Sequence, residues 1–159
     1  MIRVGTGYDV HAFKPGDKIY LCGVEIPFDK SLDGHSDADV ALHALTDAIL
    51  GALALGDIGL HFPDTDKKWK GAESVTFLSW SLEQAQQRNL KLTNIDLTII
   101  CEKPKINKYR EQLTLSLSKI CSLEQNRINV KATTTERLGF TGREEGIASI
   151  CSILLHETS

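Results

Sequence analysis

The chain has 159 residues, a formal net charge of −3, 42% hydrophobic residues and 25% charged residues. This length suits one domain spanning residues 1–159, and the composition is typical of a globular protein rather than a disordered tail. Lysine and arginine form no basic stripe, and no apolar run reaches the length of a signal sequence or a membrane span. We therefore expect no nucleic-acid partner, no membrane partner and a cytoplasmic location.

In the first half of the chain, short apolar alternation broken by glycine and proline predicts strands at residues 2–4, 19–21 and 24–26. The most clearly indicated helix runs from Asp39 to Leu55. That segment is rich in alanine and leucine, follows a capping-box pattern beginning at Ser36, and stops at Gly56. Residues 57–66 are predicted to form a loop that could close over a ligand.

The second half predicts helices at residues 73–88 and 109–121 and strands at residues 95–101, 128–133 and 148–155. This order predicts an α+β fold, a single-domain mixed sheet with helices packed on one face. The other face of such a sheet needs cover. We expect the apolar last strand to supply a subunit contact in a homo-oligomer through Ile150, Ile153 and Leu155.

A candidate metal site is formed by Asp9, His11 and His43. Side chains two apart on an extended segment point to the same side, so Asp9 and His11 can reach one ion. Three ligands leave a tetrahedral zinc ion one open position, which suits catalysis. The alternative is a turn carboxylate and two partly buried histidines. The four cysteines form no C-x-x-C pair, which argues against a thiolate zinc site.

Asp39, His43 and Asp47 form one polar line along the apolar helix, at spacings of four residues. Burying two carboxylates and an imidazole without partners costs roughly several kcal/mol. We therefore expect this polar line to face a metal, a hydrogen-bond network or a solvent-filled cleft. His35 and Ser36 stand at the helix entrance, where free backbone amides attract anions. Ser36 also suits an N-cap, whereas capping leaves His35 unexplained; a histidine there could stabilise charge on a phosphate.

Two further segments suggest phosphate or nucleotide binding. One segment ends a predicted strand with Thr133, Thr134 and Thr135 and continues into Glu136. The threonine hydroxyls and the carboxylate offer hard oxygen atoms, which suit a magnesium ion between phosphates. The alternative is that threonines are there only because they favour strands. Residues 101–107 follow a strand and read either as a surface turn or as a nucleotide pocket. The G-T-G segment at residues 5–7 lacks the third glycine of a dinucleotide fingerprint.

Four blocks in order, GTGYDVHAF, HSDADVALHALTDAILGALALGDIG, FPDTD and VKATTTERLGFTGREEGIA, span almost the whole chain. Together they resemble the 2-C-methyl-D-erythritol 2,4-cyclodiphosphate synthase family of the non-mevalonate isoprenoid pathway. The resemblance implies a phosphorus-oxygen lyase. In its reaction the 2-phosphate of 4-diphosphocytidyl-2-C-methyl-D-erythritol 2-phosphate attacks its own β-phosphorus, which gives the 2,4-cyclodiphosphate and releases CMP.

The resemblance also implies roles for single residues. Asp9, His11 and His43 would bind Zn2+ with its fourth position open to a substrate phosphate, and Glu136 would help hold Mg2+ or Mn2+. His35 and Thr134 would stabilise the transition state, and Asp47 would orient a ligand imidazole. The residues expected to contact substrate are Asp9, Val10, His11, His35, Ser36, Asp57, Ile58, Gly59, Phe62, Pro63, Asp64, Thr65, Asp66, Cys101, Glu102, Lys103, Pro104, Lys105, Ile106, Asn107, Thr133, Thr134, Thr135, Glu136, Phe140 and Arg143.

Family members are homotrimers, and the cytidine pocket, formed by residues 101–107 and 133–135, would lie at a subunit boundary. Phe140 and Arg143 would face a central cavity. Thr6 replaces a histidine common in the family and Ile150 replaces an acidic residue of some relatives, which leaves the cavity ligand open. Two alternatives to the synthase are a zinc hydrolase that activates water, and a non-enzymatic nucleotide-binding module with a structural metal.

Overall fold

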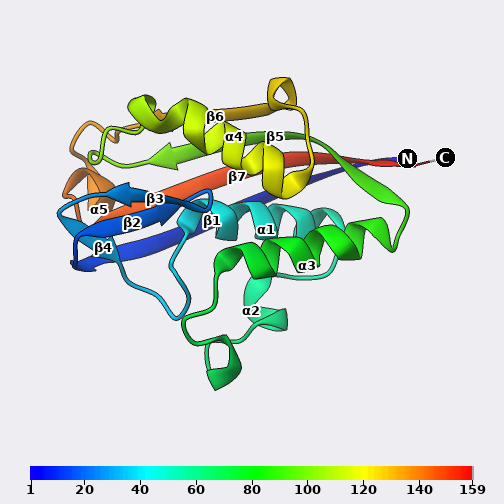
Figure 1. The fold of residues 1–159 in the computed structure, drawn as a ribbon, viewed down its shortest axis with the longest axis horizontal. Helices are drawn as coiled ribbons and strands as arrows, with labels where there is room; N and C mark the ends of the chain where they lie inside the picture. The colour runs from blue at the N-terminus through cyan, green and yellow to red at the C-terminus, as the bar shows by residue number, and fades with distance from the viewer. Residues whose placement is uncertain (159) are drawn as a thin grey trace.

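The computed structural model describes residues 1–158. Its main sheet has five strands in the order β4-β1-β7-β5-β6, and β2 and β3 form a separate hairpin (Figure 1). Strands β5 and β6 are parallel, and the other neighbouring pairs in the sheet are antiparallel. The strands are β1 (Ile2–Pro15), β2 (Lys18–Leu21), β3 (Val24–Pro27), β4 (Lys30–Leu32), β5 (Leu90–Ile100), β6 (Ile128–Thr133) and β7 (Gly146–Glu157).

The helices occur where the sequence predicts them, with additional short elements in the connections. The main helices are α1 (Val40–Ala52), α3 (Ser74–Gln86) and α4 (Arg110–Cys121). The short elements are α2 (Ile58–His61), α5 (Gly139–Gly142) and the 3-10 turns η1 (Lys67–Trp69), η2 (Ile106–Tyr109) and η3 (Gln125–Arg127). Within residues 1–158, no helix has both the length and the apolarity that crossing a membrane requires.

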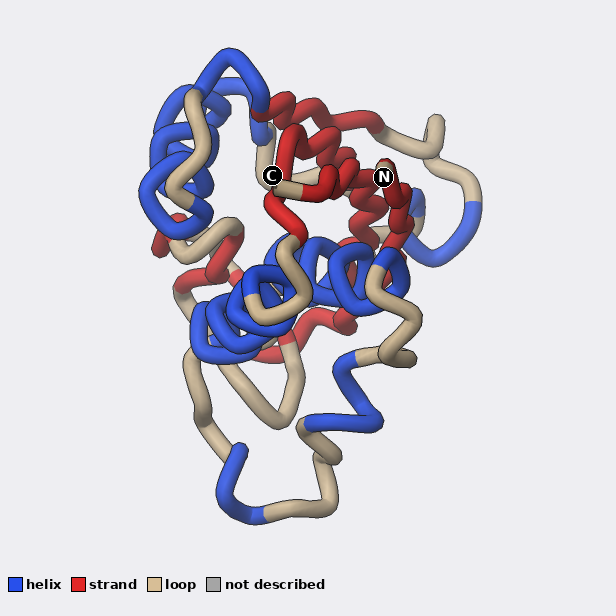
Figure 2. The backbone as a smooth tube through the Cα atoms, turned by 90° about the vertical axis from the view of Figure 1, so that its right-hand side faces the viewer, coloured by secondary structure: helices blue, strands red, loops and turns tan. Residues whose placement is uncertain are grey.

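One face of the sheet is covered by helices, as the sequence predicts. Residues that pair across the strands, such as Ile95 with Ile153 and Leu97 with Cys151, are buried together. Helix α1 packs on β1 and β7, α3 on β5, and α4 on β6. The segment containing α2 and η1 projects below α1 and α3, away from the sheet (Figures 1 and 2). We call residues 57–72 the arm.

The first strand is much longer than predicted. It extends to Pro15 and pairs with β7 from Ile2 to Ala12, so Asp9 and His11 lie within the strand and not beyond it. Gly5 and Gly7, which suggested a break, are needed for close packing. A Cβ atom at Gly5 would lie 1.8 Å from the Ala48 carbonyl oxygen, and one at Gly7 would lie 1.9 Å from that of Ala44. The glycines therefore let α1 lie directly on β1.

The N-terminus of α1 also differs from the prediction. Asp39, and not Ser36, is the N-cap, and its carboxylate accepts hydrogen bonds from the backbone N–H groups of Leu42 (3.0 Å), Cys22 (3.0 Å) and Gly23 (2.7 Å). The helix ends at Ala52, three residues earlier than predicted. Of the predicted polar line Asp39, His43 and Asp47, Asp39 therefore faces a hydrogen-bond network. This network joins α1 to the β2–β3 hairpin.

The other face of the sheet is open and carries exposed apolar residues, including Val4 (68% exposed), Tyr8 (52%) and Ile150 (39%). Ile150 lies beside Tyr8, and the Thr6 and Ser152 hydroxyls are 3.3 Å apart on the same face. The prediction that Ile153 and Leu155 belong to a contact surface is wrong. Strand alternation turns both toward the helices, where they are buried.

Candidate metal centre

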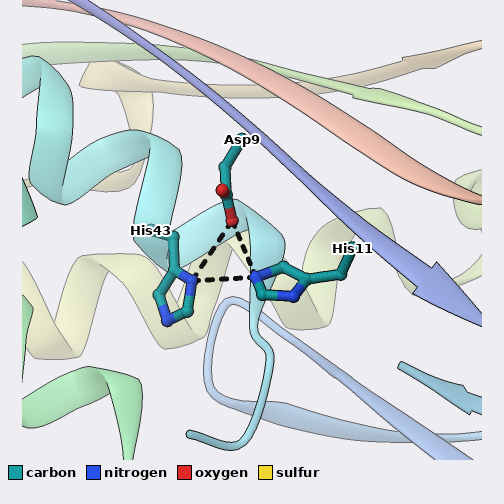
Figure 3. Close-up of side chains that lie close together, drawn as sticks. All are labelled: Asp9, His11 and His43. Carbon is teal, nitrogen blue, oxygen red and sulfur yellow. Dashed lines mark hydrogen bonds and ion pairs between the residues drawn. The ribbon is translucent and has the colours of Figure 1, made fainter. Parts of the chain in front are cut away.

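Strand β1 and helix α1 bring Asp9, His11 and His43 together (Figure 3). Asp9 Oδ2 lies 2.9 Å from His11 Nε2 and 3.2 Å from His43 Nδ1, and the two imidazole nitrogens are 3.0 Å apart. The side chains are only 10–26% exposed. Because zinc bonds to nitrogen and carboxylate oxygen are about 2.0–2.2 Å long, one ion can reach all three atoms.

The outer nitrogen of His11 fixes what the ring offers to this cluster. His11 Nδ1 lies 2.7 Å from the backbone carbonyl oxygen of Asp33. A carbonyl only accepts, so Nδ1 carries the proton in this contact and Nε2 presents a lone pair to the cluster. A lone pair that faces a carboxylate oxygen and a second imidazole needs a proton or a cation between them. The donor set therefore fits a divalent metal.

The charges of the cluster are strongly coupled. Burial alone would raise the pKa of Asp9, but the close contacts of its carboxylate with His11 and His43 outweigh it and lower that pKa to about 2. Burial likewise opposes charge on His11, yet the hydrogen bond and charge of Asp9 raise its pKa above the ordinary value. Asp9 is thus a stable anion. Its negative charge favours positive charge on the neighbouring His11.

A pocket of about 500 Å3 opens beside the two histidines. Aromatic side chains form one wall: the Phe62 and Phe77 ring centroids are 4.6 Å apart, and Trp69 meets Phe62 edge-on at 4.9 Å. The lining residues are His11, Gly34, His35, Ser36, His43, Ile58, Gly59, Phe62, Pro63, Asp64, Thr65, Trp69 and Phe77. The pocket thus brings together most of the predicted metal and arm residues, and it adds Trp69 and Phe77, which the sequence reasoning missed.

Three predicted contact residues have other positions. The segment 57–66 is not wholly loop: Asp57 caps α2, where its carboxylate accepts a hydrogen bond from Leu60 N–H at 2.9 Å. Val10 is exposed, on the opposite side of β1 from Asp9 and His11. Asp66 caps the turn η1 through Lys68 N–H, and its carbonyl lies 3.3 Å from His35 Nε2. In this structure Asp57 and Asp66 shape the arm, and Val10 takes no part in it.

A second, separate pocket of about 180 Å3 lies where β5 and β6 end. It is lined by Cys101, Pro104, Lys105, Ile106, Asn107, Ala132, Thr133 and Thr134. The lining includes most of the residues predicted to bind cytidine. Two of them have other partners: Glu102 accepts hydrogen bonds from backbone N–H groups, and Lys103 pairs with Glu144. Burial raises the pKa of the Cys101 thiol to about 12, so this cysteine is a packing residue and not a nucleophile.

The remaining predicted residues lie beyond this second pocket. Glu136 is exposed and its backbone is left-handed (φ 55°). Phe140 is 38% exposed on α5, and Arg143 pairs with Glu145 at 3.1 Å. The pocket beside the metal cluster and the pocket at the strand ends share no lining residue. Within one chain the structure therefore does not bring Thr134 or Glu136 to the pocket that holds His11 and His43.

Asp47 does not orient His43 as predicted. Its carboxylate accepts a hydrogen bond from Ile58 N–H at 2.8 Å and so fixes the start of the arm. His43 Nε2 instead lies 2.7 Å from Ser74 Oγ and 3.2 Å from Ser36 Oγ. Ser74 lies 31 residues further along the chain, so helical spacing could not identify it. Its only signal was a small polar residue at the start of an amphipathic helix.

The fold and the site together define an α+β protein with helices on one face of its sheet. Its candidate metal centre has three ligands and lies beside a pocket with an aromatic wall. The chain matches the YgbB family over residues 2–156 and belongs to that family. This confirms the family that the sequence resembles. A 2-C-methyl-D-erythritol 2,4-cyclodiphosphate synthase of Cereibacter sphaeroides is 55% identical over 154 residues, which are 97% of each chain.

Other relatives are longer. A protein of Paracoccus denitrificans described as bifunctional enzyme IspD/IspF is 59% identical over 97% of this chain but only 40% of its own length. The chain thus spans about two fifths of such relatives. Among solved structures, the bifunctional IspDF of Campylobacter jejuni has a TM-score of 0.95 at 42% identity, covering 100% of this chain and 43% of that one. A cyclodiphosphate synthase in a CDP-bound form has a TM-score of 0.89 at 40% identity, covering 97% and 100%.

Proposed function

We propose that the chain is a 2-C-methyl-D-erythritol 2,4-cyclodiphosphate synthase. In the proposed reaction an oxygen of the substrate 2-phosphate forms a bond to the β-phosphorus of the cytidine diphosphate group. The bond between that phosphorus and the oxygen bridging to the α-phosphorus breaks, and CMP leaves. The observation that carries the proposal is the three-ligand cluster beside a pocket, in a chain that is 55% identical to a synthase over nearly its full length.

Asp9, His11 and His43 would hold Zn2+ in this proposal. When bound, the metal supplies positive charge that offsets the charge on phosphate oxygens and orients them for in-line transfer. The chain's own contribution is position. The glycines of β1 let α1 lie close, so that His43 faces the two ligands on the strand.

The pocket beside the cluster would bind the phosphorylated methylerythritol part of the substrate. His35 and Ser36 provide polar groups on one side, and residues 62–65 with Trp69 enclose the other side. His35 Nε2 contacts the Asp66 carbonyl at 3.3 Å; with a proton on both nitrogens, His35 would keep this contact and donate from Nδ1 to a phosphate, stabilising charge that develops during transfer. The apolar aromatic wall would limit water beside the reacting phosphates, which favours cyclisation over hydrolysis.

The cytidine would bind the pocket at the ends of β5 and β6, with Thr134 and Glu136 next to the diphosphate and Mg2+ or Mn2+ held with the help of Glu136. The pocket beside the metal cluster and the pocket at the ends of β5 and β6 share no lining residue. We therefore propose that one substrate molecule occupies the first pocket of one subunit and the second pocket of a neighbouring subunit. The exposed apolar residues of the open sheet face support a homotrimer, because assembly would cover them.

Release of CMP from the cytidine substrate, measured by chromatography, tests the proposal. We expect release by the wild-type protein and essentially none by His43→Ala, which removes one metal ligand. His156→Gln is the control, because His156 contacts Thr93 (2.8 Å) and lies outside both pockets. Absence of CMP release by metal-loaded wild-type protein would contradict a synthase and favour a binding module.

A further inference from the structure

We propose that Ser74, held by Asp37, is a positioning residue for the metal centre, because it fixes which nitrogen of His43 carries a proton. The inference rests on the proposed function insofar as His43 is taken as a metal ligand. It concerns a residue outside the ligand triad, on helix α3 rather than on β1 or α1.

The contacts form a chain of three side chains. Ser74 Oγ lies 2.7 Å from His43 Nε2, on the side of the ring away from Asp9 and His11. The Ser74 hydroxyl donates to Asp37 Oδ1, and the Ser74 backbone N–H donates to Asp37 Oδ2 at 3.0 Å. Ser74 is fully buried and His43 is only 8% exposed, so the Ser74 hydroxyl is shielded from solvent.

The direction of each proton follows from this arrangement. The Asp37 carboxylate can only accept, so the single hydroxyl proton of Ser74 goes to Asp37. Ser74 Oγ then offers His43 a lone pair at 2.7 Å, and His43 Nε2 donates its proton to this oxygen, which is nearer than Ser36 Oγ at 3.2 Å. A neutral imidazole has one N–H, so His43 Nδ1 is left with a lone pair that points to Asp9 and His11.

Ser74 therefore has the same role for His43 that the Asp33 carbonyl has for His11. Both rings are held with their protonated nitrogen outward and their free nitrogen toward the cluster. Such outer hydrogen bonds fix the tautomer and orientation of ligand histidines, and losing one typically weakens metal binding about 10- to 100-fold.

Substitution of Ser74 by alanine tests this inference with zinc alone as the probe. Chelator competition measures the Zn2+ dissociation constant of the full chain, and we expect that of Ser74→Ala to be about 10- to 100-fold higher than wild type. Ser81→Ala is the matched control. Ser81 is a fully buried serine on the same helix, but it donates to the Leu78 carbonyl at 2.7 Å and lies outside the pocket.

A wild-type dissociation constant in Ser74→Ala, or an equal loss in Ser81→Ala, would overturn the positioning role. If the wild-type protein itself binds no zinc, the proposed metal centre fails instead, so the two failures are distinguishable. Long-range 1H–15N NMR of the chelator-treated wild-type protein at pH 8 keeps the test valid even if Ser74→Ala does not fold. We expect the proton of His43 on Nε2, and a proton on Nδ1 would overturn the inference.

Discussion

The carboxylate of Glu102 accepts a hydrogen bond from the backbone N–H of Arg137 at 3.1 Å, which ties the end of β5 to the turn after β6. The same oxygen accepts from Thr135 N–H at 3.3 Å. Within this turn Glu136 and Arg137 both have left-handed backbones, at φ 55° and 65°, a conformation that costs a side-chain-bearing residue about 1–2 kcal/mol. Glu102 thus holds in place the turn that carries Thr134 and Glu136.

Glu102→Ala removes the acceptor for two backbone donors in a strained turn. We expect a loss of unfolding free energy of about 1–2 kcal/mol and a fall in kcat/KM of roughly tenfold or more, with zinc affinity unchanged. Denaturant unfolding, CMP release and chelator competition measure the three quantities. Glu124→Ala, which loses only an exposed ion pair with Arg127, is the control. Unchanged kcat/KM in Glu102→Ala would contradict the positioning of this turn.

Thr134→Val removes a hydroxyl from the pocket at the ends of β5 and β6, the proposed nucleotide site, while keeping the shape of the side chain. If Thr134 stabilises charge on the diphosphate, kcat should fall roughly a hundredfold, while zinc content measured by elemental analysis stays at the wild-type level. A variant with wild-type kcat would remove Thr134 from the catalytic residues. Loss of zinc would show instead that the hydroxyl acts through the structure.

The pKa shifts at the cluster predict opposite pH effects with and without metal. The pKa of His11 is raised on folding, so the native metal-free protein binds more protons than the unfolded chain. Its stability therefore falls as pH rises from about 6.5 through the raised pKa. Zinc competes with the same proton, so its affinity rises over this range.

Thermal unfolding midpoints between pH 6 and pH 8.5 check this prediction. The difference between the midpoints of the zinc-loaded and metal-free forms should widen with pH, and the zinc dissociation constant should fall at least about tenfold from pH 5.5 to 8. A constant difference across this range would mean that zinc does not displace a proton from His11.

Glycine substitutions test the contact between β1 and α1 that places His43. Gly7→Ala would put a Cβ atom 1.9 Å from the Ala44 carbonyl oxygen, so the helix must shift, and we expect a loss of about 3 kcal/mol or more together with weaker zinc binding. Gly51→Ala is the matched control on α1. Its Cβ would meet only the Thr6 carbonyl oxygen at 4.0 Å, so alanine should stabilise the helix by about 0.5–1 kcal/mol. Changes of equal sign in the two variants would contradict this account of the packing.

The sequence predicted the elements with strong local signals. The alanine-rich run before Gly56 identified α1, and the D-x-H spacing with His43 identified three side chains that the structure brings together. What it missed depends on contacts between distant segments. Gly5 and Gly7 suggested a break in the strand. The backbone of α1, which requires glycine at both positions, lies about forty residues away in the sequence. Ser74 and Trp69 join the site only through packing, and Asp47 was misassigned because helical spacing does not show that Ile58 N–H lies nearby.

Phosphorus NMR of the purified protein with 4-diphosphocytidyl-2-C-methyl-D-erythritol 2-phosphate and magnesium tests the central claim most directly, with and without a zinc chelator. We predict signals of CMP and a cyclic diphosphate that are lost with the chelator and return when zinc is restored. Linear phosphorylated products would contradict the synthase and indicate a zinc hydrolase, and full activity in the chelated, zinc-free protein would contradict the role of the Asp9, His11 and His43 cluster.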